Sequence, residues 1–154
     1  MKEVVDILIE KGKTISTMES CTGGAVVNAI TNVEGSSAVL KYSAVTYSNE
    51  YKIKMGVSED LINRYSVYSK EVAQDMAKTV ADFTNSDYSI GITGKLGVSD
   101  PNNNYGDNNI VYISIYEKNK NVYYNYTFDA ENISRKDNKD KIIEFISLKL
   151  KEIL

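Results

Sequence analysis

The sequence contains no histidine, one cysteine and one proline in 154 residues. Without histidine, neither a Ser-His-Asp nor a Cys-His catalytic group can form, and a histidine-ligated zinc site is excluded as well. A hydrolase built from this chain must therefore take its general base from Lys, Tyr, Asp or Glu. The lone Cys21 excludes a disulfide framework and any metal site that needs several cysteines.

A basic surplus and long apolar runs are also absent. The chain carries 18 Lys and Arg against 21 Asp and Glu, a formal net charge of −3, which argues against binding through a nucleic-acid backbone. No apolar run approaches the length of a membrane span, and the acidic start over residues 1–6 does not fit a signal peptide. We expect one cytoplasmic domain over residues 1–154 that binds neither nucleic acid nor membrane, and a homo-oligomer stays open.

The hydrophobic pattern alternates between helical and strand periods and predicts an α/β fold. The helix that follows Ser69 is expected to bury Val72, Met76, Val80 and Phe83 along one face. Residues 100–104 have the composition of a turn. Helices on both faces of a mixed sheet follow from the order of the elements. The expected helices lie at 2–11, 23–32, after Ser58, after Ser69 and from Ser134, and the expected strands at 14–18, 41–47, 88–92, 110–116 and 121–128.

The stretch Thr-Met-Glu-Ser-Cys-Thr-Gly-Gly at residues 17–24 lies where the first strand gives way to a helix. The first N–H groups of a helix lack internal partners and accept an anion, often a phosphate. Ser20 or Cys21 is a candidate nucleophile at such a junction. The alternative is an ordinary capped helix, with Ser20 or Thr22 as N-cap and the glycines easing a tight turn.

Two further polar groups follow predicted strands, one at residues 46–52 and one, rich in glycine, at 91–97. The carboxyl ends of strands in an open α/β sheet form the edge at which ligands bind. Each group alone is a weak signal, because a single lysine such as Lys52 is usually solvated and spaced glycines can be two successive turns. A serine with a lysine and a tyrosine in reach is nevertheless a known way to activate a hydroxyl without histidine. The lysine must be neutral, so partial burial and nearby positive potential have to lower its pKa from about 10.4 to about 7–8.

These groups keep the order and spacing of a known family. Nearly the whole chain resembles the C-terminal domain of the competence/damage-inducible protein CinA, which also occurs alone as nicotinamide-mononucleotide deamidase. The resemblance implies a three-layer α/β/α sandwich on a mixed sheet of about five strands. It also implies a nucleotide-binding amidohydrolase that needs no metal or other cofactor and converts nicotinamide mononucleotide to nicotinic acid mononucleotide and ammonia. The motifs that carry the resemblance are Glu19-Ser20-Cys21-Thr22-Gly23-Gly24, Gly35-Ser36-Ser37, Val45-Thr46-Tyr47-Ser48-Asn49-Glu50 with Lys52, and Val67-Tyr68-Ser69.

The resemblance also implies roles for individual residues. Ser20 would attack the carboxamide carbon, Lys52 would act as base, and Tyr47 would position Lys52 or relay its proton. Backbone N–H groups near Thr22 and Gly23 are candidates for holding either the oxyanion or a phosphate. The substrate-binding residues implied by the family motifs are Thr22, Gly23, Gly24, Thr46, Asn49, Gly94 and Arg135.

The glycine-rich loop departs from the family pattern. The family reads approximately Gly-Ile-Ala-Gly-Pro-x-Gly-Gly, whereas residues 91–97 of this chain read Gly-Ile-Thr-Gly-Lys-Leu-Gly. Ligand contacts are expected in this loop, so a second hypothesis is a catalytically impaired or substrate-shifted nucleotide-binding homologue. Release of ammonia from the mononucleotide separates the two hypotheses.

Overall fold

The computed structural model describes residues 1–97, 103 and 106–154, so most of the turn expected at residues 100–104 lies outside the described part. Among the described residues, no helix has both the length and the apolar character needed to cross a bilayer. Helices and strands alternate as expected, with boundaries within about two residues of the sequence-based ones. The elements are α1 (Lys2–Glu10), β1 (Ile15–Glu19), α2 (Ala25–Thr31), η1 (Ser36–Ala38), β2 (Leu40–Val45), α3 (Asn49–Lys54), α4 (Glu59–Tyr65), α5 (Lys70–Thr84), β3 (Tyr88–Gly94), β4 (Ile110–Glu117), η2 (Lys118–Lys120), β5 (Val122–Asp129) and α6 (Arg135–Ile153).

The five strands form one mixed sheet in the order β2-β1-β3-β4-β5. β1 pairs in parallel with both β2 and β3, whereas β4 runs antiparallel to β3 and to β5. The carboxyl ends of β1, β2 and β3 therefore share one edge of the sheet. The loops that leave these three strands carry Ser20, Thr46 and Lys95.

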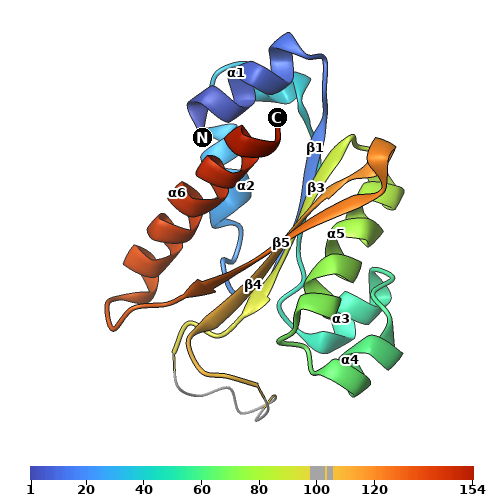
Figure 1. The fold of residues 1–154 in the computed structure, drawn as a ribbon, viewed down its shortest axis with the longest axis vertical. Helices are drawn as coiled ribbons and strands as arrows, with labels where there is room; N and C mark the ends of the chain where they lie inside the picture. The colour runs from blue at the N-terminus through green and yellow to red at the C-terminus, as the bar shows by residue number, and fades with distance from the viewer. Residues whose placement is uncertain (98–102, 104–105) are drawn as a thin grey trace.

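Helices cover both faces of this sheet, which confirms the three-layer architecture. Figure 1 shows α1, α2 and α6 on one face and α3, α4 and α5 on the other. The first face buries an apolar cluster that includes Val5, Ile30 and Ile142. The opposite face buries a second cluster around Met18 and Met76.

Serine side chains begin four of the helices, and three of these serines, Ser58, Ser69 and Ser134, are the residues from which the sequence predicts a helix. The hydroxyl of Ser58 accepts a hydrogen bond from the Leu61 N–H, and that of Ser69 accepts one from the Val72 N–H. Ser48 and Ser134 cap α3 and α6 in the same manner. Such caps satisfy backbone donors that a helix start would otherwise leave unpaired, and each contributes about 1 kcal/mol.

One predicted core position in α5 is wrong. Val72, Met76 and Val80 are fully buried, but Phe83 is 67% exposed and packs against the ring of Tyr42 at a centroid distance of 5.3 Å. Phe83 lies in the last turn of α5, where the helix extends past the apolar cluster that receives the other three side chains. The helical period places a residue on a face, but it does not show how far the neighbouring layer extends.

Close packing of α5 on the sheet depends on Gly91 in the middle of β3. A methyl group built on Gly91 would lie 2.1 Å from the carbonyl oxygen of Ala73 in α5, a distance that no side chain can occupy. The helix backbone therefore approaches the strand directly. This approach fixes the height of α5 above the sheet and, with it, the position of the loop before α5.

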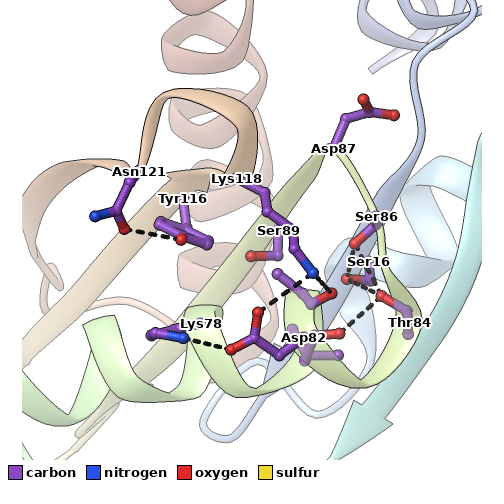
Figure 2. Close-up of polar contacts among 12 residues, drawn as sticks. Ser16, Lys78, Asp82, Thr84, Ser86, Asp87, Ser89, Tyr116, Lys118 and Asn121 are labelled. Atoms are coloured by element: carbon purple, nitrogen blue, oxygen red, sulfur yellow. Dashed lines mark hydrogen bonds and ion pairs between the residues drawn. The ribbon is translucent and has the colours of Figure 1, made fainter.

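A cluster of serine and threonine hydroxyls lies near the amino end of β1, at the edge of the sheet opposite to Ser20. Figure 2 shows the hydroxyls of Ser16, Thr84 and Ser86 joined by hydrogen bonds, with Ser16 Oγ and Ser86 Oγ 2.7 Å apart. Nearby, Asp87 accepts hydrogen bonds from the Lys13 ammonium and from both the N–H and the hydroxyl of Thr14, each at 2.9 Å. Burial of the Asp87 carboxylate raises its pKa, but these donors outweigh burial and lower the pKa to about 2. The polar side chains described here bind one another, and their hydrogen bonds connect the start of β1 to the residues that precede β3.

The Asp87 contacts predict a pH-dependent contribution to stability. Because its folded pKa lies below the unfolded value of about 3.9, the carboxylate stabilises the fold above that pH, and the contribution is lost as the pH falls through about 2. We expect Asp87→Asn to lower the free energy of unfolding by about 1–2 kcal/mol at pH 7 and by much less near pH 2.5. Urea unfolding of both proteins at the two pH values measures the difference. Asp6→Asn, which removes an exposed ion pair with Lys2, is the control, and an equal loss at both pH values for Asp87→Asn would contradict the assignment.

Candidate active site

Ser20 and Lys52 meet at the carboxyl edge of the sheet. The Lys52 Nζ lies 3.0 Å from the Ser20 Oγ, although the two residues are 32 positions apart in the chain. Ser20 follows the last residue of β1, and Lys52 extends from α3 on the face of the sheet that also buries Met18. The pair has the distance that direct proton transfer between an amine and a hydroxyl requires.

Lys52 is the largest fully buried side chain of the protein's described part, with 1% of its surface exposed. Its Nζ also donates a hydrogen bond to the Thr46 carbonyl oxygen at 2.7 Å. Burial out of water disfavours the charged form of an amine. A lysine held in this way by a serine and a carbonyl is unlike most surface lysines of the chain, which pair with carboxylates.

Glu19 determines the shape of the turn that presents Ser20. Its side chain is completely buried, and its carboxylate accepts hydrogen bonds from the N–H groups of Gly24 at 3.1 Å, Val26 at 3.2 Å and Val27 at 2.8 Å. The first turn of α2 is therefore capped by an acid from the preceding strand. Neither Ser20 nor Thr22 acts as the N-cap, because the N-cap residue is Gly24 and no side chain at that position contributes.

The Glu19 carboxylate bears on the expectation that backbone N–H groups near Gly23 hold an oxyanion or a phosphate. The Gly24 N–H is bound to Glu19, and the Gly23 N–H donates to the Ser20 carbonyl oxygen at 3.0 Å. Neither N–H is available to an incoming phosphate or oxyanion in this conformation. Within the described part of the chain, the N–H groups of Cys21 and Thr22 donate to no other residue, so these two remain as donors next to the Ser20 hydroxyl.

Cys21 points away from Ser20 into the core. It is 4% exposed and belongs to the apolar cluster on the side of α1, α2 and α6. Burial raises the pKa of the Cys21 thiol to about 12. A thiol with this pKa is protonated at neutral pH, and only the thiolate is a strong nucleophile. The geometry favours Ser20 as the nucleophile at this turn.

The side chain of Tyr47 turns toward solvent and contacts Arg135. Its side chain is 64% exposed, and its hydroxyl accepts a hydrogen bond of 3.4 Å from Arg135 Nη2. Within the described part of the chain, no direct hydrogen bond joins Tyr47 to Lys52, the residue that Tyr47 is expected to position. Arg135 Nη1 also donates to the Leu96 carbonyl oxygen. The guanidinium therefore connects the loops after β2 and β3, and Tyr47 and Arg135 form a second polar group at this edge.

The remaining predicted substrate-binding residues fall into three cases. Asn49 begins α3, and its Nδ2 donates to Asn103 Oδ1 at 2.9 Å. Thr22 and Thr46 bury hydroxyls that have no hydrogen-bond partner in the described part of the chain. Gly94 has a structural reason to be glycine, because a methyl group there would lie 2.5 Å from the Ile110 carbonyl oxygen of β4.

Three residues at this edge lie outside the sequence-based set of site residues. Glu19 occupies the helix start, as described above. Lys139 of α6 places its Nζ 3.3 Å from where a methyl group on Gly23 would lie, and its spacing of four from Arg135 is a signal that the two share a helix face. Lys95 is 7% exposed, with its ammonium 5.0 Å from the centre of the Tyr68 ring. No group of three or more cysteine or acidic side chains in the described ranges is arranged to hold a metal ion.

The fold and the site define a class of protein: a three-layer α/β/α domain with a serine and a buried lysine at the carboxyl edge of its parallel strands. A search of protein families identifies the family within this class. The model of the CinA C-terminal domain matches residues 1–153, and the chain belongs to this family.

Curated relatives and solved structures agree with this family. A putative competence-damage inducible protein of Clostridium kluyveri is 40% identical over 122 residues, which make up 77% of this chain and 29% of that protein. A CinA-like protein of Endomicrobium trichonymphae is 46% identical over 92 residues, 59% of this chain and 22% of that protein. The chain thus spans about a quarter of the length of these relatives.

Two crystal structures of similar proteins show the same fold. The CinA superfamily protein from Escherichia coli superimposes with a TM-score of 0.86 at 25% identity, over 99% of this chain and 87% of that one. The competence or damage-inducible protein from Enterobacter asburiae gives a TM-score of 0.89 at 22% identity, over 99% and 95% of the two chains. These structures confirm the expected sandwich on a mixed five-stranded sheet.

The Glu19 contacts predict a large effect of a small substitution. Glu19→Gln replaces one acceptor oxygen by an NH₂ group that faces backbone N–H groups, and it removes the charge that strengthens the other bonds. We expect a loss of about 2–4 kcal/mol in the free energy of unfolding, measured by urea denaturation at pH 7. Glu34→Gln, on an exposed turn beyond α2, is the matched control and should change stability by less than about 0.5 kcal/mol. A loss no larger than that of the control would show that the carboxylate does not hold the turn.

Proposed function

We propose that this domain is an amidohydrolase that converts nicotinamide mononucleotide to nicotinic acid mononucleotide and ammonia. The observation that carries the proposal is the 3.0 Å contact between the Ser20 hydroxyl and the buried Lys52 amine. Membership of the CinA C-terminal domain family supports this reaction, because the sequence resembles the form of that domain that acts as a mononucleotide deamidase. The protonated, buried state of the Cys21 thiol supports serine as the attacking group.

In the first step, the Ser20 Oγ attacks the carboxamide carbon while the neutral Lys52 amine takes the hydroxyl proton. Negative charge develops on the carboxamide oxygen. The N–H groups of Cys21 and Thr22 are the donors left uncommitted beside the nucleophile, and the N–H of the residue after a nucleophile commonly stabilises such an oxyanion. The Lys52 ammonium then returns its proton to the leaving nitrogen, and ammonia departs from the acyl-serine ester.

Water completes the reaction in the second step. Lys52, neutral again, takes a proton from the attacking water, and collapse of the tetrahedral intermediate breaks the bond to the Ser20 Oγ. Lys52 returns the proton to the serine, and the carboxylate product leaves. The hydrogen bond from Lys52 to the Thr46 carbonyl oxygen holds the amine in place through both steps. The Tyr47 hydroxyl pairs with Arg135, so in this proposal we assign Tyr47 to the substrate side of the site and leave the relay of the Lys52 proton unassigned.

Release of ammonia tests the nucleophile. Purified wild-type protein should release ammonia from nicotinamide mononucleotide, Ser20→Ala should lose this activity, and Cys21→Ala should keep most of it. A coupled ammonia assay measures the rates, and thermal unfolding of each variant shows that the fold is retained. Loss of activity only in Cys21→Ala would overturn the assignment of Ser20. A wild-type protein that binds the mononucleotide but releases no ammonia would instead support the binding homologue.

The pH dependence of the rate tests the base. Lowering the pH protonates the Lys52 amine, which then cannot accept the serine proton, so the rate should fall on the acidic side of the profile. Arginine keeps its proton at every accessible pH, so we expect Lys52→Arg to lose activity at least about 100-fold, as much as Lys52→Ala. Lys54→Arg, an exposed lysine that pairs with Glu50, is the matched control and should remain active. Substantial turnover by Lys52→Arg would show that another group is the base.

A further inference from the structure

The two edge strands of the sheet, β2 and β5, differ in how open they are to another strand. β2 has a break in its register with β1 between Leu40 and Tyr42, and it carries the exposed Lys41. Bulges and lysines are two of the means by which proteins prevent edge-to-edge pairing. β5 has neither, because its eight residues pair with β4 in an unbroken register and include no lysine or proline. Figure 1 shows β5 at the outside of the sheet, with α6 on one side and α5 on the other.

The hydrogen bonds of β5 show which of its backbone groups face outward. In an antiparallel pair, alternate residues bond to the neighbouring strand, and the residues between them point away from it. The Ala130 N–H donates to the Asn109 carbonyl oxygen at 2.7 Å, and this pair continues the register of β4 with β5. The even-numbered residues of β5 therefore bond to β4, and the N–H and C=O groups that point outward belong to Tyr123, Asn125, Thr127 and Asp129. Within the described part of the chain, these four residues form no backbone hydrogen bond to a segment beyond the sheet.

The side chains of β5 divide between the two faces of the sheet. Tyr124, Tyr126 and Phe128 pack against the apolar cluster on the α6 side. The rings of Tyr126 and Phe128 both contact Phe145 of α6, at centroid distances of 5.8 and 5.9 Å. The opposite face of the strand exposes three polar side chains, those of Asn125, Thr127 and Asp129. β5 therefore carries an aromatic row on one face and a polar row on the other, and both rows end at an unpaired backbone.

A second copy of β5 fits the outward groups of the first. Antiparallel pairing about a two-fold axis at Tyr126 places Tyr123 of one copy opposite Asp129 of the other. Asn125 then lies opposite Thr127, so all four outward residues of each copy form hydrogen bonds across the axis. A shift of two residues in either direction leaves one of the four without a β5 residue opposite. The pairing is isologous, because the same strand supplies both halves of the interface.

The side chains favour the same register. On the α6 side, Tyr124 lies opposite Phe128 of the other copy, and Tyr126 lies opposite its own counterpart. The two aromatic rows thus become one, and aromatic pairs across neighbouring strands stabilise a sheet. On the polar side, Asp129 of each copy lies opposite Tyr123 of the other, so no like charges oppose each other. A register centred on Asp129 would instead bring two carboxylates together, which is unfavourable.

We propose that β5 is a dimerisation strand, and that two copies of this chain pair through it and join their five-stranded sheets into one. Each copy contributes the N–H and C=O groups of its four outward residues, and protein hydrogen bonds replace water on both. The interface uses none of the candidate active-site residues, because Ser20, Lys52 and Arg135 lie outside β5. The dimer is therefore independent of the proposed reaction.

The mass of the whole chain in solution tests the dimer. Sedimentation equilibrium should give twice the 17.2 kDa of one chain. Thr127→Lys puts a charged side chain on the open edge, close to the axis where the two copies meet, and should weaken the dimer at least about tenfold. Asn63→Lys adds the same charge to an exposed position of α4 and is the matched control, which should stay dimeric. Circular dichroism shows that both variants keep the fold.

Cysteine cross-linking tests the register. In the proposed pairing, the two copies of residue 126 lie opposite each other with their Cα atoms about 4.5 Å apart, within the range of a disulfide. Each residue along a strand adds about 3.4 Å, so the two copies of residue 124 lie about 14 Å apart. Mild oxidation should therefore cross-link Tyr126→Cys but not Tyr124→Cys, as seen by denaturing gel electrophoresis. The natural Cys21 is buried and does not compete.

The two experiments decide the proposal together. A dimer that Thr127→Lys weakens and Asn63→Lys does not, with cross-linking confined to Tyr126→Cys, would support it. A wild-type protein that is monomeric at about 0.1 mM would overturn it, and so would a dimer that Thr127→Lys leaves unchanged. Equal cross-linking of the two folded cysteine variants, whether strong or absent, would overturn it as well.

Discussion

The carboxyl edge of the sheet depends on the buried carboxylate of Glu19. A charged group without access to water is tolerated only when hydrogen bonds replace its hydration. Here three N–H groups of the α2 start do so, which ties the last residue of β1 to the first turn of the helix. Both ends of the intervening turn are thereby fixed, and Ser20 has little freedom to leave the edge. The same carboxylate occupies the N–H groups of the helix start, so they are not available to another anion.

Many features of the fold could be predicted because they depend on local sequence. The serine caps of α4, α5 and α6 act within three residues, and the hydrophobic periods are read over a few turns. The expectation for the α2 start failed for the opposite reason. Its cap comes from Glu19, five to eight residues before the N–H groups that it binds, which is outside the usual capping spacing. Phe83 failed because its exposure depends on where the neighbouring layer ends.

The candidate site was predictable to the extent that the sheet topology brings loops together. Ser20 and Lys52 were expected to converge because parallel strands place their carboxyl ends at one edge, and they do lie 3.0 Å apart. The direction of a flexible side chain cannot be obtained in this way. Tyr47 is adjacent to Thr46, whose carbonyl binds Lys52, yet its ring turns outward to Arg135, 88 positions along the chain. The contact between Tyr47 and Arg135 depends on how α6 packs against this edge, which local sequence does not show.

The register of β1 decides which of two neighbouring side chains contacts Lys52. Side chains alternate along a strand, so Met18 faces the α5 side and Glu19 faces α2. The alternation continues into the turn: Ser20 meets Lys52 of α3, and Cys21 enters the opposite apolar cluster. A shift of one residue would exchange the two faces, and it would place the thiol beside the lysine and the hydroxyl in the core. Burial of all five β1 residues specifies this register. The sides of the sheet on which Ser20 and Cys21 lie are therefore set by the register of the central strand, before any property of the two side chains enters.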